Sequence, residues 1–214
     1  LLSSSTKVFV LMDLFKNRLR EGNQTLSSID TATLSKRFRG RPDLFPDRCK
    51  EGCHECAEAC PTEAIALSPL RLDMGACLFC GLCEGACSTG AIRFTNDHRL
   101  SVRKREQLVL SDQELPLARQ LEEAIRKRFS RSLKLRTVSA GDCNGCESEL
   151  AALENVVFDL QRFGIQFVTS PRHADGIVIT GPITGNMELP LRETYAAIPS
   201  PKIVIAVGAC AISG

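Results

Sequence analysis

The stretch CKEGCHECAEACP (residues 49–61) decides the fold of the first part of this chain. It holds four cysteines, and a second run, CLFCGLCEGACS (residues 77–88), repeats the pattern. Four closely spaced cysteines suit a cubane iron–sulfur cluster, because each iron needs one thiolate, and the run ending in Cys60 and Pro61 carries the bacterial ferredoxin signature with one additional residue. The two runs therefore predict a pair of 4Fe–4S clusters.

The two runs form an internal repeat. The last three cysteines of the first run recur 27 positions later, whereas Cys49 recurs as Cys77, at an offset of 28. In dicluster ferredoxins the fourth cysteine of each run ligates the cluster of the other run. We therefore predict two interleaved ligand sets, namely Cys49, Cys53, Cys56 and Cys87 for one cluster, and Cys77, Cys80, Cys83 and Cys60 for the other.

Two departures from the ferredoxin pattern bear on this assignment. Three residues instead of two separate Cys49 from Cys53, which predicts a longer first loop and a cluster that is more exposed or less tightly held, and Ser88 stands where proline is usual. Zinc is the alternative metal, because four thiolates also bind zinc. Zinc modules usually place a longer spacer between two Cys-x2-Cys pairs, so the iron–sulfur interpretation fits better. His54 lies inside the first run, where we expect an exposed loop residue in preference to a ligand.

Composition limits what the rest of the chain can be. The 214 residues have room for two small domains, and the cysteine repeat fills one of them. Eleven cysteines, most of them in metal-ligand spacing, with no cleavable signal sequence, indicate a reducing cytoplasm and not a disulfide framework. A formal net charge of +2 gives no general attraction to nucleic acid, so no nucleic-acid partner is expected.

The segments outside the repeat have their own patterns. No apolar run reaches the length of a membrane-spanning helix. Residues 7–20 favour an amphipathic helix that lies on a membrane, docks on a membrane partner or packs against the chain itself. A polar connector follows, and a charged helix at about residues 116–129 links the repeat to the next domain. The predicted division is an N-terminal helix and connector, a ferredoxin-like domain, a helical linker and a C-terminal domain, at residues 1–37, 38–110, 111–132 and 133–214.

From about residue 133 apolar strands alternate with helices, which predicts a parallel α/β sheet. The expected strands cover residues 135–138, 165–169, 176–180 and 202–207, and the expected helices cover about 147–163 and 189–197. Cys143 and Cys146 follow the first strand, and Cys210 follows the last. Because open α/β sheets bind ligands beyond the carboxyl ends of their strands, we predict that the three thiols share a third site. Neighbouring glycines allow the backbone to turn tightly beside a bulky cluster.

Three segments resemble the small subunit of energy-converting (group 4) nickel–iron hydrogenases of the formate hydrogenlyase type. They are DCNGCESE (142–149), RHADGIVITGPIT (172–184) and PKIVIAVGACAISG (201–214). That family is homologous to the 20 kDa-type, cluster-bearing subunit of respiratory complex I next to its quinone site. Residues 38–110 are similar to the dicluster ferredoxin-type subunit of the same complexes. The resemblance implies a fusion of two subunits, with an α+β dicluster ferredoxin domain followed by an α/β flavodoxin-like parallel-sheet domain.

The resemblance also implies roles for single residues. Cys143, Cys146 and Cys210 correspond to three of the four ligands of the proximal 4Fe–4S cluster, adjacent to the nickel site of the large subunit. In the family the fourth ligand follows further downstream, so we expect the C-terminal domain to be truncated here and its cluster to need one more ligand. Glu149 matches an acidic residue near that cluster. A part in proton movement is one hypothesis for Glu149, and charge complementarity with the helix N-terminus is the other.

The leading hypothesis for function is an electron-transfer subunit of a multisubunit nickel–iron hydrogenase, which is not catalytic alone. Its partners would be the large subunit, membrane-arm subunits and another electron carrier or formate dehydrogenase. The alternative is a complex I-type (NADH:quinone oxidoreductase-like) subunit that passes electrons to quinone with a 49 kDa-like subunit as its partner. Complex I subunits usually carry adjacent cysteines where this chain has Cys143-Asn-Gly-Cys146, which favours hydrogenase. Either complex implies a peripheral position on the cytoplasmic face of the membrane, and a zinc-binding scaffold is the third, non-enzymatic hypothesis.

Overall fold

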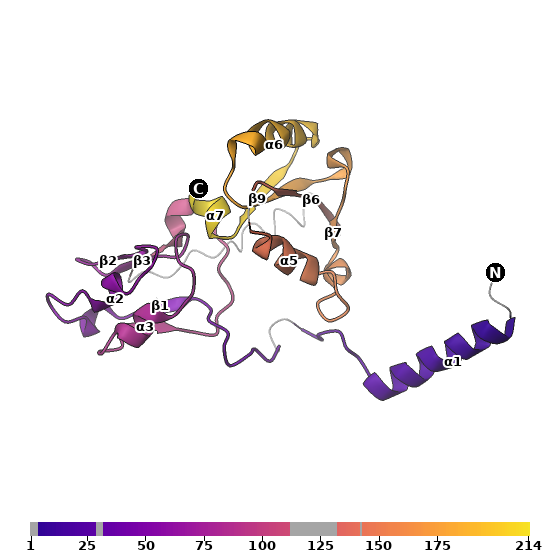
Figure 1. Ribbon diagram of the computed structural model, residues 1–214, viewed down its shortest axis with the longest axis horizontal. Helices are drawn as coiled ribbons and strands as arrows, with labels where there is room; N and C mark the ends of the chain where they lie inside the picture. The colour runs from indigo at the N-terminus through magenta and orange to yellow at the C-terminus, as the bar shows by residue number, and fades with distance from the viewer. Residues whose placement is uncertain (1–3, 29–31, 112–131, 142) are drawn as a thin grey trace.

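The computed structural model describes residues 4–28, 32–111, 132–141 and 143–214. Its strands form separate sheets in two parts of the chain (Figure 1). We call residues 40–110 the cysteine-repeat region and residues 133–214 the parallel-sheet region. The linker helix expected at residues 116–129 lies outside the described residues.

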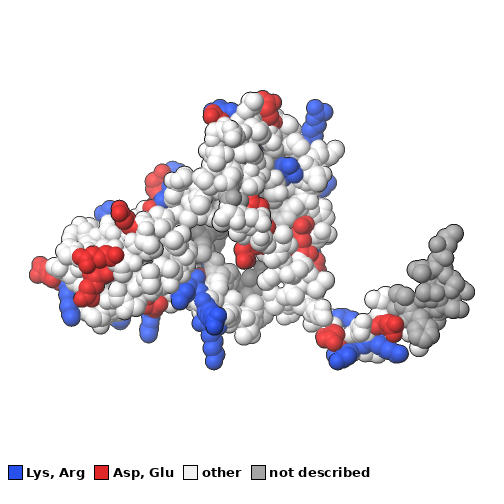
Figure 2. Space-filling view, viewed as in Figure 1, with Lys and Arg blue, Asp and Glu red and all other residues white. Residues whose placement is uncertain are grey.

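Helix α1 (Ser4–Glu21) stands apart from both regions at the end of an extended connector (Figure 1). The apolar side chains that are described on it are more than half exposed: Met12, Leu14, Phe15 and Leu19. Figure 2 shows basic and acidic side chains together on the described end of this helix and interspersed over the rest of the same face. Within the described residues, no helix is both long enough and apolar enough to cross a membrane.

The connector after α1 contacts the parallel-sheet region. The backbone N–H of Leu26 donates to the carbonyl of Val157 at 2.9 Å, and the hydroxyl of Thr25 donates to the carbonyl of Val156 at 2.9 Å. Arg162 donates in the opposite direction, to the carbonyl of Leu26. These bonds tie the connector to the segment that precedes the second strand of the parallel sheet.

The cysteine-repeat region is built from short elements in two similar halves. They are β1 (Pro42–Leu44), η1 (Pro46–Arg48), α2 (Glu55–Glu58), β2 (Ile65–Ala66), β3 (Arg71–Asp73), α3 (Leu82–Ala86), β4 (Ile92–Phe94), η2 (Arg105–Leu108) and β5 (Val109–Leu110). Strand β1 pairs with β4, and β3 lies between β2 and β5, all antiparallel. Leu72 and Ile92, each 1% exposed, fill the core between the two cysteine runs.

Backbone conformation follows the sequence repeat. Glu63 and Gly90 occupy the same repeat position, three residues after the fourth cysteine of each run, and both have a positive φ, of 52° and 66°. Gly52 and Phe79 directly precede the second cysteine of each run and share this conformation, with φ of 74° and 54°. L side chains rarely adopt a positive φ, so the turn around each thiol imposes it on whichever residue stands there.

The parallel-sheet region has four strands in the order β7-β6-β8-β9, all parallel. The strands are β6 (Leu133–Ser139), β7 (Ile165–Phe167), β8 (Gly176–Thr180) and β9 (Ile203–Val207). The helices are α5 (Gly145–Ala152), η3 (Leu160–Phe163), η4 (Pro171–His173), α6 (Gly185–Ala197) and α7 (Ala209–Ser213). Ile177 and Val178 of β8 alternate in direction, so Ile177 packs with Leu191 of α6 and Val178 packs in the cluster that includes Leu150 of α5. The two helices therefore cover opposite faces of the sheet.

Two of the helices differ from their predicted extents. The helix expected over residues 147–163 ends at Ala152, because the side chain of Asn155 accepts the backbone N–H groups of Val157 and Phe158 and so competes with helical bonding. Helix α6 starts at Gly185, four residues earlier than predicted, and contains Pro190. The predicted strands agree with the structure to within two residues at each end.

Candidate metal centres

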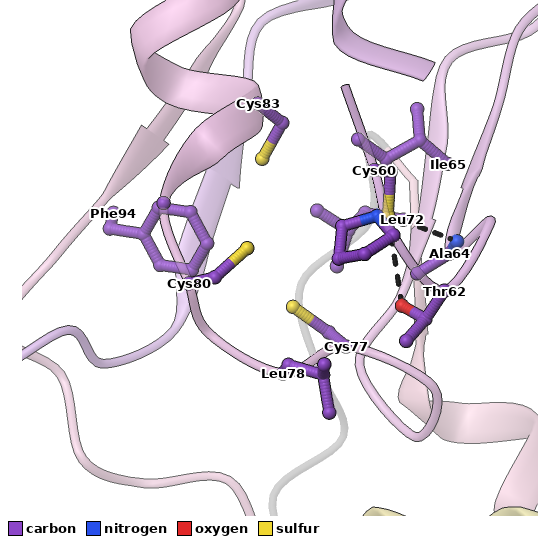
Figure 3. Close-up of a pocket in the computed structure, with 12 residues that line it drawn as sticks. Cys60, Thr62, Ala64, Ile65, Leu72, Cys77, Leu78, Cys80, Cys83 and Phe94 are labelled. Atoms are coloured by element: carbon purple, nitrogen blue, oxygen red, sulfur yellow. Dashed lines mark hydrogen bonds between the residues drawn. The ribbon is translucent and has the colours of Figure 1, made fainter. Parts of the chain in front are cut away.

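Four thiols line one pocket in the cysteine-repeat region (Figure 3). Cys60 comes from the end of the first run, and Cys77, Cys80 and Cys83 come from the second. In Figure 3 their sulfur atoms face one another across the pocket. The remaining walls are mainly apolar and include Ile65, Leu72, Leu78 and Phe94. The structure therefore brings together the four cysteines that the interleaved assignment groups in one set.

A second group of thiols gathers around Cys56, which is buried at the start of the short helix α2. Its pKa is raised first by burial and then by the charges of Cys87 and Cys49, which places these two thiols close to it. Cys53, which is partly buried, lies on the loop between Cys49 and α2. Cys87 thus crosses from the second run to the first, as Cys60 crosses from the first to the second.

The two crossing thiols receive matching hydrogen bonds. The backbone N–H of Ala64 donates to Sγ of Cys60 at 3.3 Å, and the hydroxyl of Thr62 lies 3.7 Å from the same sulfur. Around Cys87, the N–H of Ala91 is at 3.2 Å and the threonine hydroxyl two positions after the cysteine is at 3.6 Å. Burial acts to raise the pKa of both thiols, but these bonds outweigh it and hold each pKa below its ordinary value.

The other buried thiols behave in the opposite way. Burial raises the pKa of Cys83 to about 11, and the neighbouring Cys77, Cys60 and Cys80 add to the effect. The pKa of Cys77 is also raised, again first by burial. A bound cation reverses this preference, because it stabilises thiolates directly. These side chains must be thiolates to act as ligands. A bound metal cluster would itself stabilise the thiolate form.

The arrangement of the sulfurs distinguishes between kinds of metal site. Tetrahedral zinc requires all four thiolates at about 2.3 Å from one centre. In the described part of the chain, no three Cys, His, Asp or Glu side chains converge closely enough to hold a single ion. A cubane binds each thiolate through a different iron, so its ligands surround a volume instead of meeting at a point. The donor set around the pocket of Figure 3 fits a cubane.

The third group of thiols lies beyond the carboxyl ends of β6 and β9. Cys146 is partly buried, whereas Cys143 and Cys210 are exposed. A Cβ added at Gly208 would lie 2.5 Å from Sγ of Cys146, and Gly208 has a φ of 87°. Only glycine therefore allows the loop that leads to Cys210 to approach Cys146 this closely. Gly145 is less constrained, since its added Cβ would meet Sγ of Cys143 at 3.5 Å.

The acidic residues of α5 have different surroundings. Glu149, the residue predicted near the third cluster, is exposed. Glu147 turns inward, and its Oε1 accepts a hydrogen bond from the hydroxyl of Thr180, a side chain that is 1% exposed at the end of β8. The other oxygen of Glu147 is buried without a hydrogen-bond partner among the described residues. Sequence reasoning missed Glu147 and Thr180, although the position of Glu147 directly after Cys146, a predicted ligand, was a visible signal.

Two smaller expectations concern the first cysteine loop. His54 is exposed and directly precedes α2, as expected of a loop residue. The expectation that the longer loop leaves its cluster more exposed or less tightly held stays a prediction, and residues 50–52 of this loop are exposed. Cys49 and Cys53 are partly buried, whereas Cys80, in the loop of ordinary length, is exposed. The bend before the second cysteine is the same in both loops, with a positive φ at Gly52 and at Phe79, so the inserted residue leaves it unchanged.

Comparison with known proteins identifies two segments. Residues 143–214 match the family model described as NADH ubiquinone oxidoreductase, 20 Kd subunit, and residues 70–93 match the 4Fe-4S binding domain. Formate hydrogenlyase subunit 7 of Escherichia coli (strain K12) is 43% identical over 94 residues, which cover 44% of this chain and 37% of the relative. The probable membrane-bound hydrogenase subunit mbhJ of Pyrococcus furiosus is 43% identical over 88 residues, covering 41% of this chain and 53% of the relative.

Relatives from respiratory complexes match as well. An NADH-quinone oxidoreductase subunit of Geotalea daltonii is 48% identical over 69 residues, covering 32% of this chain and 41% of the relative. The chain thus spans between 37% and 53% of the length of these three relatives. The predicted homology with hydrogenase and complex I subunits is confirmed, and the two matched segments fit a group 4 hydrogenase-like subunit. A 4Fe–4S binding domain followed by a parallel-sheet domain agrees with the predicted fold class.

Proposed function

We propose that this chain is an iron–sulfur electron-transfer subunit of a membrane-bound nickel–iron hydrogenase complex. The observation that carries the proposal is the pocket where Cys60 of the first run meets three thiols of the second run. A ring of thiols contributed by two repeat halves is what a dicluster ferredoxin requires. The match of residues 143–214 to the 20 Kd subunit family comes from an independent part of the sequence, and the homology with hydrogenase subunits supports the same conclusion.

The proposed ligands form three sets. The first two hold one 4Fe–4S cluster each in a dicluster ferredoxin domain, and the third holds a further cluster in the C-terminal domain. The sets are Cys49, Cys53, Cys56 and Cys87; Cys60, Cys77, Cys80 and Cys83; and Cys143, Cys146 and Cys210 with a fourth ligand from outside these residues. The order β7-β6-β8-β9, which is 2-1-3-4 in chain order, supports a flavodoxin-like assignment for the C-terminal domain.

The cofactors supply the one-electron chemistry, and the protein sets their environment. The amides of Ala64 and Ala91 donate to the two crossing thiols, and hydrogen bonds to cluster sulfurs raise the reduction potential by stabilising added negative charge. Leu72 and Phe94 line the apolar wall of one pocket and limit the access of water to it. Hydrogen chemistry itself belongs to a large subunit, so this chain would not turn over hydrogen alone.

The proposed partners are the large subunit, membrane-arm subunits and a further electron carrier or formate dehydrogenase, with the chain on the cytoplasmic face of the membrane. A division at residues 37, 110 and 132 follows from the sequence and is consistent with the separate sheets. A complex I-type subunit next to a quinone site is the second candidate, supported by the match to an NADH-quinone oxidoreductase. The longer alignments with hydrogenase subunits, 94 and 88 residues against 69, favour hydrogenase.

Metal analysis of the anaerobically prepared full-length protein tests the cofactor assignment. Three cubanes predict about twelve irons and twelve acid-labile sulfides per chain, with electron paramagnetic resonance signals of reduced 4Fe–4S clusters. Zinc without sulfide would establish the scaffold hypothesis instead. Reduction of these clusters by hydrogen gas in the isolated complex would support the hydrogenase assignment, and reduction by NADH or oxidation by quinone alone would support the complex I type.

A further inference from the structure

The two regions of the chain are joined at α7. Ile212 of this helix packs against the core of the cysteine-repeat region. The hydroxyl of Ser213 donates to the carbonyl of Gly75 at 2.9 Å and accepts from Nη2 of Arg105 at 3.0 Å. One apolar contact and two hydrogen bonds therefore hold the end of α7 against the segment between β3 and the second cysteine run.

Arg105 is fixed in position by its own region. Its Nη1 and Nη2 donate to the two carboxylate oxygens of Asp73, at 2.7 and 2.6 Å, and Oδ1 of Asp73 also accepts the N–H of Gly75 at 2.9 Å. Burial acts to raise the pKa of Asp73, but the hydrogen bonds from Arg105 outweigh it and hold this pKa below its ordinary value. A bidentate pair of this kind orients the guanidinium group firmly. The surface that receives Ser213 is therefore preformed.

Gly75 gives independent support for this close fit. A Cβ added at Gly75 would lie 2.5 Å from Cζ of Arg105 and 2.8 Å from its Nε and Nη1. The guanidinium group thus lies directly on the backbone of Gly75, in space that every other residue would fill. We call Asp73, Gly75, Arg105 and Ser213 the interdomain clasp.

The clasp joins two segments that are adjacent in sequence to cysteines of two different candidate metal centres. Gly75 is two residues before Cys77, which lines the pocket of Figure 3, and Ser213 is three residues after Cys210. The rate of electron tunnelling falls exponentially with distance, so a small separation of these two loops would slow transfer severely. Transfer of one electron oxidises one site and reduces the other without making or breaking a bond, so spacing is the quantity that the protein must control.

We propose that Arg105, oriented by Asp73, is a positioning residue that holds the Cys210 loop against the Cys77 loop through Ser213. This inference rests on the proposed function, since it assumes that both loops carry clusters. The side chains of Arg105 and Asp73 are 33% and 29% exposed, so the pair adds only modestly to stability. The effect of the clasp is on the distance between two sites more than on the fold of either region.

Two variants can disrupt the clasp, one at Ser213 and one at Gly75. Ser213→Ala removes the hydroxyl and leaves the Arg105–Asp73 pair intact, whereas Gly75→Ala displaces the guanidinium group and leaves Ser213 intact. Ser213→Thr keeps the hydroxyl and should therefore retain both hydrogen bonds of the clasp. Arg192→Ala breaks an exposed ion pair on α6, away from the clasp, and serves as the control.

The measurement uses the full-length protein in its complex. Magnetic coupling between the two reduced clusters reports their distance, and rapid-mixing reduction reports the rate of transfer between them. Loss of two hydrogen bonds, one of them to a charged group, should shift the docking equilibrium and lower the transfer rate about tenfold. Ser213→Thr and Arg192→Ala should retain the coupling and the rate of the original protein.

The outcomes separate the clasp from the proposed function. Full cluster content with unchanged coupling and rate in Ser213→Ala would overturn the clasp and leave the electron-transfer assignment standing. Loss of iron from Ser213→Ala would show a merely structural role and would also overturn it. Absence of clusters from the unmodified protein would overturn both proposals. If Gly75→Ala does not fold, Ser213→Ala decides alone.

Discussion

The cysteine-repeat region and the parallel-sheet region place their thiols in different surroundings. In the first, Cys56 and Cys83 are buried in the core, and backbone amides point at the crossing sulfurs. In the second, Cys143 and Cys210 are exposed at a sheet edge. The first region builds its candidate metal centres as part of its own core, whereas the second presents its candidate site on an exposed surface, which is where the proposed partner subunit would bind.

The largest expected effect tests which region governs activity. Replacing Cys146 with Ala removes a ligand of the site proposed to face the large subunit, so hydrogen-dependent dye reduction by the assembled complex should fall to background. Replacing Cys49 with Ala should impair transfer to or from the distal partner and leave part of the proximal chemistry. An assembled Cys146→Ala complex with full activity would show that electrons do not pass through the parallel-sheet region.

A cysteine in the core should matter for folding as well as for metal content. Cys83 is 6% exposed and both packs in the core and lines a pocket. Cys83→Ser should therefore lose one cluster, about half of the iron of this region, and lower the melting temperature. Cys210→Ser is the matched control and should lose only the third centre. Equal changes in melting temperature for the two variants would contradict the contrast between core and surface sites.

Gly208 tests how closely the third site is packed. A Cβ at this position would clash with Sγ of Cys146, and the positive φ adds strain of about 1–3 kcal/mol. Gly208→Ala should lose the third cluster while the other two signals persist in the electron paramagnetic resonance spectrum. Gly185→Ala, where the added Cβ meets open space, is the control. A Gly208→Ala protein with all three signals would mean that the Cys210 loop does not need this approach.

Thr180 contacts the residue next to Cys146 in the third site, because its hydroxyl donates a hydrogen bond to Glu147. Thr180→Val keeps the shape of the side chain but removes the hydrogen bond to Glu147, whose carboxylate is already partly unsatisfied. We expect a loss of about 1–3 kcal/mol in the free energy of unfolding, measured by chemical denaturation. Thr194→Val, on α6, removes an exposed hydrogen bond to the carbonyl of Pro190 and should lower the free energy of unfolding by less. An unchanged unfolding midpoint for Thr180→Val would show that Glu147 finds another donor.

The smallest effect concerns pH and the cysteine-repeat region. Hydrogen bonds from Arg99, opposed in part by burial, lower the pKa of Asp97 from 3.8 to about 2. Because the folded value is the lower one, the ionised form stabilises the fold above about pH 4, and this contribution is lost as pH falls towards 2. Asp97→Asn should be less stable by about 1 kcal/mol at pH 7 in urea unfolding. The deficit should stay constant down to pH 5 and shrink below pH 4, and a deficit that does not change with pH would contradict this account.

The sequence predicted the features that depend on local pattern. Strand periodicity located β6, β8 and β9, and cysteine spacing grouped Cys60 with the second run. It did not predict the end of α5, because the apolar residues after Ala152 continue the helical pattern, whereas the side chain of Asn155 accepts two backbone N–H groups and so competes with helical bonding. Nor did it predict the clasp, since Arg105 and Ser213 are 108 residues apart and meet only through tertiary packing. Long-range polar contacts leave no periodic trace in a single sequence.

The matching bends after the two crossing cysteines carry different steric costs. Gly90 adopts its positive φ without steric cost, whereas Glu63 adopts the same conformation against a preference of about 1–2 kcal/mol. The turn around each crossing thiol imposes this bend on both halves, so the first half keeps it although Glu63 accommodates it poorly. Glu63→Gly should therefore relieve this strain and stabilise the first half.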